Sequence, residues 1–208
     1  MPFLLDSDLN RPLPELTRVR QHFENEHMDP SEIPAVIRTQ IHKEEIRSLV
    51  RPGMRVAVAV GSRGIRNLPV IVGETLRALT DLGARPFIVS AMGSHGGGTE
   101  EGQREVLAGY GITEEAMGVP VVTSVDTVRL GETADGRPIW FDRAAFQADL
   151  IVPVNRIKLH TDFVGPIQSG LCKMLVIGLG NHRGCSAVHE EPPEKFAGVI
   201  EEIGRAHV

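Results

Sequence analysis

Three short runs of small and β-branched apolar residues constrain the fold of this chain most strongly. They span Met54–Val60, Pro86–Ala91 and Asp149–Val154. Runs of this length, without regular polar alternation, are typical of strands buried on both faces of a parallel sheet. Each run ends near a glycine-bearing loop, and a helical pattern over Leu68–Leu82 connects the first two. The chain therefore predicts a Rossmann-like α/β fold, an open and mostly parallel sheet with helices on both faces.

Composition supports this fold class and excludes several functions. Hydrophobic residues make up 41% of the chain but aromatic residues only 4%, which favours an α/β core over an aromatic-rich β-sandwich. The formal net charge is -5, without a Lys/Arg-rich run, so we expect no nucleic-acid partner. No apolar run is long enough to cross a membrane, and the N-terminus lacks a signal-peptide pattern. Two cysteines in one segment make a poor disulfide framework, so a cytoplasmic protein is expected.

The chain divides into an arm and one domain. Residues 1–30 carry four prolines among mixed charges, which predicts an extended arm with a helical turn in its second half. Residues 31–208 should form the α/β domain. Its first helix is expected to run from an N-cap at Ser31 to Leu49. Further along, the Asp-Gly pair at 135–136 lies between two β-patterned runs, which predicts a hairpin.

The loops after the three strands are expected to meet at one edge of the sheet. They run over Gly61–Asn67, Gly93–Thr99 and Asn155–Gly165. Ligands of open α/β sheets bind in the crevice beyond the carboxyl ends of the strands. These loops carry the cationic and imidazole side chains Arg63, Arg66, His95, Arg156, Lys158 and His160. The ligand site is therefore predicted at this edge, although no loop alone matches a nucleotide-binding motif.

The loop Gly93–Thr99 combines glycines with a histidine and leads into a helix. Such a backbone can bind an anion through its N–H groups, and His95 suits general acid–base chemistry. His160 follows the third strand by six residues, so both histidines would face one crevice and handle protons on opposite faces of a substrate. Arg63 and Arg66 suit a carboxylate or phosphate. From spacing alone, the two histidines and the two arginines could also be solvated loop residues.

A second reactive segment, residues 160–189, holds three histidines, two cysteines, one lysine and five glycines. Lys173 stands in an apolar run, where desolvation would lower its pKa and make the amine nucleophilic. A lysine on the wet side of an amphipathic element is equally compatible. His182 and His189 are candidate metal ligands, but the spacing is not a zinc signature. A zinc-dependent hydrolase stays a third option, and it would need three clustered ligands.

Together these motifs are more specific than any one of them. GSRGI at 61–65, GSHGGGT at 93–99, NRIKLHTDFVGPIQSGLCKMLVIGLGNHRG at 155–184 and His189 beyond resemble the N-terminal half of the lactate racemase family that uses a nickel-pincer nucleotide. The resemblance covers residues 35–208 and is closer to a branch of uncharacterised relatives than to the lactate enzymes. It implies the N-terminal domain of a two-domain fold, with the family's C-terminal α/β domain absent from this chain.

The resemblance also implies a cofactor, pyridinium-3,5-bisthiocarboxylic acid mononucleotide nickel, which is made by dedicated biosynthesis enzymes and expected to be absent without them. Lys173 matches the lysine that holds the cofactor through a thioamide. His189 best matches the nickel ligand, with His182 as the weaker candidate. His95 and His160 match the acid/base pair, while both cysteines are expected to be packing residues. The remaining cofactor-binding residues would be Gly93, Ser94, Gly96, Gly97 and Arg63.

Members of that family move a hydride from the α-carbon of a 2-hydroxy acid to the cofactor and back on either face. The resemblance therefore implies a racemase or epimerase of a small 2-hydroxy acid. The chain departs from the lactate enzymes in two places. The interval from His160 to Lys173 is longer, so this loop differs, and Ser62–Arg66 replaces a substrate-side Asp/Arg pattern, which argues against assuming lactate as the substrate. The sequence leaves the substrate and the oligomeric state open. The alternative from another class is a non-catalytic module that binds a nucleotide or anion on its glycine loops.

Overall fold

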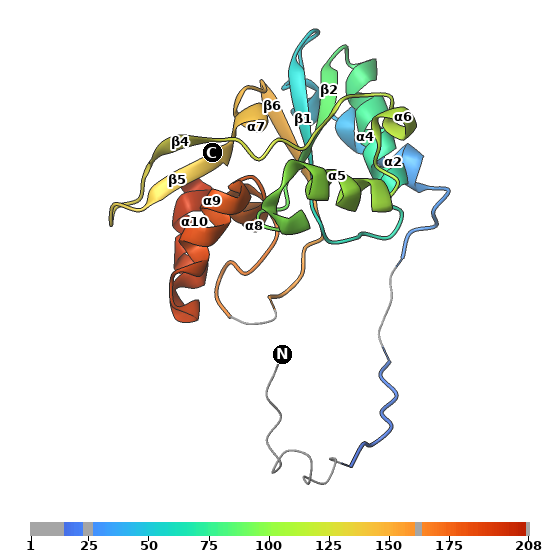
Figure 1. Cartoon of the computed structure of the whole chain (residues 1–208). Helices are drawn as coiled ribbons and strands as arrows, with labels where there is room; N and C mark the ends of the chain where they lie inside the picture. The colour runs from blue at the N-terminus through green and yellow to red at the C-terminus, as the bar shows by residue number, and fades with distance from the viewer. Residues whose placement is uncertain (1–14, 23–26, 161–163, 207–208) are drawn as a thin grey trace.

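The computed structural model describes residues 15–22, 27–160 and 164–206, and a four-stranded, all-parallel sheet forms its centre (Figure 1). The strand order is β3-β2-β1-β6. The strands are β1 (Arg55–Val60), β2 (Arg85–Ser90), β3 (Val121–Val122) and β6 (Leu150–Val154). The three expected strands are all present, each within one residue of its predicted bounds. The α/β prediction is confirmed.

Strand β1 shows why these runs are apolar without alternation. Every residue from Val56 to Val60 is buried. Its backbone pairs on one side with β2 and on the other with β6, so that Val58 lies opposite both Ile88 and Val152. Both faces of β1 are covered, and its backbone N–H and C=O groups are paired with a strand on each side. These positions are therefore shielded from water, and apolar side chains suit all of them.

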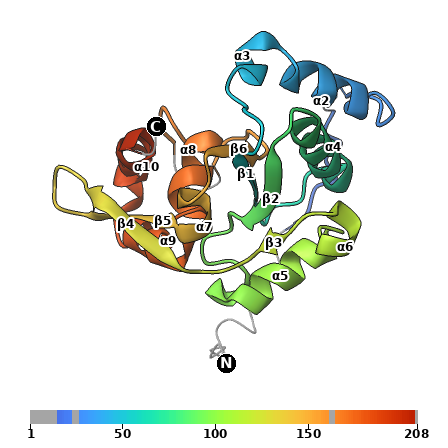
Figure 2. The same ribbon diagram turned by 90° about the horizontal axis from the view of Figure 1, so that it is seen from above.

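Helices cover the first face of the sheet (Figure 2). Val72, Leu76 and Leu79 of α4 form one buried cluster with the valines of β1, and Leu107 of α5 extends it. Helix α2 packs beside α4 in the same layer. This layer consists of α2 (Ile33–Ile41), α3 (Glu44–Arg47), α4 (Leu68–Asp81), α5 (Glu100–Gly109) and α6 (Glu114–Met117).

A β-hairpin and helices cover the second face. Phe141 of the hairpin and Ala145 of the following helix pack against Ala57 and Ala59 of β1, whose small side chains allow this close approach. The hairpin is antiparallel, as the Asp-Gly signal predicts. The layer contains β4 (Thr127–Glu132), β5 (Pro138–Asp142), α7 (Arg143–Phe146), the π-helical turn η2 (Met174–Gly178), α9 (Asn181–His189) and α10 (Phe196–Ala206). None of the helices in the described ranges is both long and apolar enough to cross a membrane.

Three expectations about the N-terminal region are wrong. Residues 15–22 are extended and contain no helical turn. Ser31 does not cap the first helix, because its hydroxyl donates to the carboxylate of Asp29 at 2.6 Å; the helix begins at Ile33 without a side-chain cap. It ends at Ile41 rather than Leu49, since Lys43 is extended (ψ 144°) and a new helix starts there.

A buried polar link holds the hairpin to the start of α9. The Asp142 carboxylate caps α7 by accepting from the N–H of Ala145 at 2.8 Å, and its other oxygen accepts from Asn181 Nδ2 at 2.8 Å. Asp142 and Asn181 are both fully buried. Burial raises the pKa of Asp142, although the bonds from Ala145 and Asn181 oppose the rise. This link sets the position from which α9 presents its histidines.

The carboxyl ends of three strands meet at one edge of the sheet. Val60 lies opposite Ser90 of β2 and Val154 of β6, so the loops after these strands leave from the same level. The chain passes from β1 through β2 to β3, and then returns to β6 on the other side of β1. The strand order thus reverses between β1 and β6, which is where open α/β sheets bind ligands.

Candidate functional site

His95 is the centre of the side chains that the structure brings together at this edge. Its Nδ1 is hydrogen-bonded to the hydroxyl of Ser62 in the loop after β1. Tyr110, at the end of α5, donates its hydroxyl hydrogen to the carbonyl oxygen of Ser62 at 2.7 Å. The Tyr110 ring also packs against Gly64. The loops after β1 and β2 are therefore joined directly.

The surroundings of His95 disfavour its protonated form. Burial lowers the pKa of His95 below its ordinary value of 6.5, and the positive charges of Arg63 and Lys173 lower it further. The side chain nevertheless keeps an exposed surface at the rim of the sheet. The lowered pKa favours the neutral imidazole, which is the form able to accept a proton. Arg63, His95 and Lys173 were all predicted as site residues, and they lie close enough to interact electrostatically.

Removing the Arg63 charge should raise the pKa of His95. We expect Arg63→Met to move this pKa up toward its ordinary value, because one of the two cations that oppose protonation is lost. An NMR titration of the His95 imidazole, assigned with a His95→Gln variant, measures the change. Arg66→Met in the same loop is the matched control and should leave the pKa of His95 in place. Equal shifts in the two variants would contradict a specific effect of Arg63.

Lys173 lies where a short helix becomes a π-helical turn. It ends α8 (Leu171–Lys173) and is half-buried, and η2 follows directly. Such π-turns are frequent at functional sites. The turn also contacts both glycine loops, because Gly93 donates its N–H to the carbonyl of Gly178 at 3.0 Å and Met174 packs against Gly61. Lys173 is thus held by the element that packs on the two loops.

A buried glutamine anchors the loop that carries His95. Gln103 of α5 is fully buried, accepts a hydrogen bond from Ser90 at 2.6 Å and donates to the carbonyl of Gly93 at 3.1 Å. No role was predicted for it. The sequence spacing could have indicated that Gln103 is buried. It lies one turn before Leu107, and these two residues form the buried face of α5. An amide at such a position needs backbone partners.

The N-terminus of α5 already has its own negative partners. Thr99 caps it by accepting from the N–H of Gly102 at 3.1 Å. Glu100 and Glu101 occupy the first turn, where they satisfy the helix dipole. This terminus is therefore poorly suited to an additional phosphate, which weakens the alternative of an anion-binding module. The N–H of Gly93, which was also predicted to bind the cofactor, is already donated to the Gly178 carbonyl. Phosphate binding by Ser94, Gly96 and Gly97 stays a prediction that depends on the N–H groups of the loop itself.

Two neighbouring glycines separate the effects of backbone strain and packing. Gly96 and Gly97 have φ values of 65° and 68°, but a Cβ on Gly96 would lie 2.5 Å from the Gly102 carbonyl carbon, whereas one on Gly97 meets nothing within 4 Å. We expect Gly97→Ala to cost about 1 kcal/mol from its left-handed backbone. Gly96→Ala should cost about 1–3 kcal/mol more, since α5 or the loop must move.

Urea unfolding followed by circular dichroism measures both free energies. Equal losses for the two alanine variants would show that the loop does not pack on α5 as described.

The two histidines of helix α9, His182 and His189, have different hydrogen-bond partners. His189 donates from Nδ1 to the carbonyl oxygen of Cys185 at 2.7 Å, so Nε2 is the nitrogen left for a metal. A bond of this kind fixes the tautomer of many metal-binding histidines. His182 instead packs its ring against Gly98, and its Nδ1 lies 3.5 Å from the Ser186 hydroxyl. The geometry supports His189 over His182, and the choice stays a prediction.

The two cysteines are free thiols, as expected for packing residues. Cys185 is buried, and its Sγ lies 3.5 Å from both the Ser94 hydroxyl and Nδ1 of His189. Cys172 is half-buried and packs against Gly204 of α10. Cys185 therefore connects the glycine loop to α9 by contact.

His160 lies in the loop that follows β6. It is half-buried, and its backbone N–H donates to the side-chain oxygen of Gln168 at 3.1 Å. Gln168 in turn donates to the carbonyl of Gly165 at 3.1 Å. These bonds tie the residue before 161–163, which lie outside the described ranges, to the segment after them. That the imidazole of His160 faces His95 across a substrate stays a prediction.

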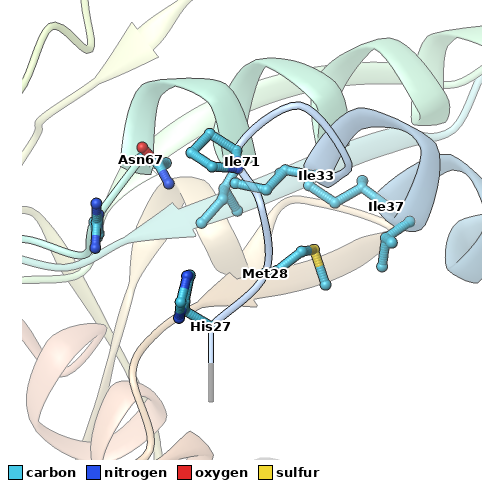
Figure 3. A pocket seen from close by; sticks show the side chains of 9 residues that line it. His27, Met28, Ile33, Ile37, Asn67 and Ile71 are labelled. Atoms are coloured by element: carbon cyan, nitrogen blue, oxygen red, sulfur yellow. The ribbon is translucent and has the colours of Figure 1, made fainter. Parts of the chain in front are cut away.

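A hollow of about 380 Å³ lies away from this cluster, between the arm and the helical layer (Figure 3). Its walls are mainly apolar and include Met28, Ile33, Ile37 and Ile71, with Arg66, Asn67 and His27 at its polar end. Neither His95 nor Lys173 lines it. The candidate site is therefore the cluster around His95, where ionisable groups act on one another, and not this hollow.

Metal-ligand geometry bears on the zinc alternative. Within the described ranges, no three His, Cys, Asp or Glu side chains come together as a metal site. A zinc hydrolase would need such a cluster, so this part of the chain gives it no support. A metal that receives most of its ligands from a cofactor needs only one protein ligand, which His189 can provide.

Comparison with known proteins agrees with the geometry. The model of the lactate racemase N-terminal domain matches residues 11–196, a range that includes Arg63, His95, His160, Lys173 and His189. No curated protein matches the chain significantly. Because the match covers most of the 208 residues, the chain belongs to the lactate racemase N-terminal domain family.

Proposed function

We propose that this chain is the cofactor-binding domain of a racemase or epimerase that acts on a 2-hydroxy acid with a nickel-pincer nucleotide. One observation carries the proposal: the edge of the sheet groups His95 with Arg63 and Lys173, close enough for both residues to act on the imidazole in addition to its burial. These three side chains could serve as a base, a cation for the cofactor phosphate and a lysine for its attachment. Family membership supports racemase chemistry, and the cofactor is assigned from the residue matches.

The residues present fit the cofactor. Lys173 is half-buried beside both glycine loops, where a tethered group would lie over the carboxyl edge of the sheet. The free Nε2 of His189 suits nickel. Arg63 and the exposed Gly97 would offer donors to the mononucleotide phosphate, together with Ser94 and Gly96. When bound, the cofactor would supply the acceptor for the α-hydrogen of the substrate, which leaves as a hydride.

The side chains of this chain would handle the proton of the substrate hydroxyl. His95 would accept this proton while the substrate is oxidised and return it to the hydroxyl oxygen of the product. His160 would do the same on the opposite face, so that the hydroxyl of either enantiomer can be reprotonated.

Racemisation with an isotopic label tests the function. The full chain, coexpressed with the cofactor-biosynthesis enzymes and nickel, is incubated with single enantiomers of a panel of 2-hydroxy acids that carry deuterium on the α-carbon. We expect at least one acid to racemise with its deuterium retained, because a hydride does not exchange with water. Exchange of the label with solvent would indicate proton abstraction instead. A panel without any racemisation would contradict the proposal.

A further inference from the structure

The contact between Ser62 and His95 assigns separate tasks to the two imidazole nitrogens. Ser62 Oγ is hydrogen-bonded to Nδ1, so that nitrogen is occupied by the protein. We propose that Ser62 is a positioning residue, which holds Nδ1 of His95 so that Nε2 is the nitrogen that exchanges protons with the substrate. This inference rests on the proposed function of His95 as acid and base.

Helix α5 holds both partners of this contact. At its C-terminal end Tyr110 donates to the carbonyl oxygen of Ser62 at 2.7 Å and packs its ring against Gly64. Near its N-terminal end Gln103 donates to the carbonyl of Gly93, two residues before His95. Because one rigid helix fixes both loops, the serine hydroxyl and the imidazole keep a defined relative position.

A hydroxyl suits this task better than a carboxylate. With Nε2 as the proton-accepting nitrogen, Nδ1 carries the ring hydrogen and donates it to Ser62 Oγ, both in the neutral ring and after Nε2 has taken up a proton. A carboxylate would also accept this hydrogen bond, but its negative charge would favour the imidazolium and oppose proton return. The charged groups that act on the imidazole are Arg63, on the loop of Ser62, and Lys173, on α8. An acidic residue at position 62 would offset both cations.

Three variants test the positioning role. Ser62→Ala removes the hydroxyl, Ser62→Thr keeps it, and Tyr110→Phe removes the bond to the Ser62 carbonyl while keeping the ring against Gly64. The first readout is the ¹⁵N NMR shift of the two His95 ring nitrogens in the full chain without cofactor. We expect the Nδ1 shift to change in Ser62→Ala and to stay near the wild-type value in Ser62→Thr. Circular dichroism checks that each variant is folded.

The second readout is the rate of the loaded protein. Ser62→Ala should lower kcat by about 10- to 100-fold with little change in KM, because a misaligned base affects the transition state more than binding. Ser62→Thr should restore most of this loss, and Tyr110→Phe should fall between the two. Ser62→Asp should raise the pKa of His95 and move the acid limb of the pH–rate profile to higher pH.

The outcomes separate this inference from the proposed function. If the wild type racemises and His95→Gln does not, but Ser62→Ala matches the wild type in kcat and in the Nδ1 shift, the positioning role is overturned while the function stands. If the wild-type holoprotein racemises no acid, the proposed function fails. The proposed role of Ser62 in proton transfer then fails as well, even if the Nδ1 shift of His95 changes in Ser62→Ala.

Discussion

His95→Gln is expected to lower the racemisation rate of the loaded protein by about 10²- to 10⁴-fold, the usual worth of a positioned general acid or base. Glutamine is similar in size and can still bond to the Ser62 hydroxyl, so the loop should keep its conformation. It cannot take up the substrate proton. The loss should appear in kcat, with KM nearly unchanged, in a chiral assay of product over time.

His42→Gln is the matched control for this variant. His42 caps the end of α2 and lies within hydrogen-bonding distance of the Arg38 carbonyl oxygen, at 2.9 Å; it makes no bond to the loops of the site. Its rate should equal that of the wild type. A His95→Gln protein that racemises at the rate of this control would remove His95 from the reaction.

Lys173→Arg is expected to abolish racemisation altogether. The guanidinium keeps the positive charge but lacks the primary amine through which the cofactor would be attached. Because the charge is kept, the pKa of His95 should stay low in Lys173→Arg, whereas it should rise in Lys173→Met. The NMR titration of His95 therefore separates loss of attachment from loss of the local field.

Lys158→Arg controls for the exchange of lysine for arginine in the same region, since Lys158 is exposed in the loop after β6. It should retain racemisation. Activity in Lys173→Arg comparable with that of Lys158→Arg would show that the cofactor, if present, is held elsewhere.

The central sheet and the location of the site could be predicted because single physical causes dictate them. Strand β1 is apolar from Val56 to Val60 because both of its faces are covered, and such a run can be recognised in the sequence. Parallel pairing then brings the strand ends to one edge, so that Arg63 and His95 become neighbours. The hairpin could be predicted from the Asp-Gly pair at 135–136, which is typical of a tight turn between two strands.

The finer contacts could not be predicted because they join residues that are distant in the chain. Ser62 and His95 are 33 positions apart, and Ser62 and Tyr110 are 48 apart; no local pattern records such pairs. Ser31 had the residue type of an N-cap, but a bond to Asp29 competed for its hydroxyl. The local sequence was therefore sufficient to predict most of the helices and strands, whereas contacts between distant residues determine which polar groups are paired.

The mass of the intact wild-type chain shows whether the cofactor is attached covalently to Lys173. The protein is purified after coexpression with the cofactor-biosynthesis enzymes in nickel-containing medium, and its mass is compared with that of protein made without them. The account predicts a covalent adduct only in the first preparation, located on Lys173 by fragmentation of the peptide that contains it. An unmodified Lys173 in protein that was supplied with cofactor and nickel would contradict it.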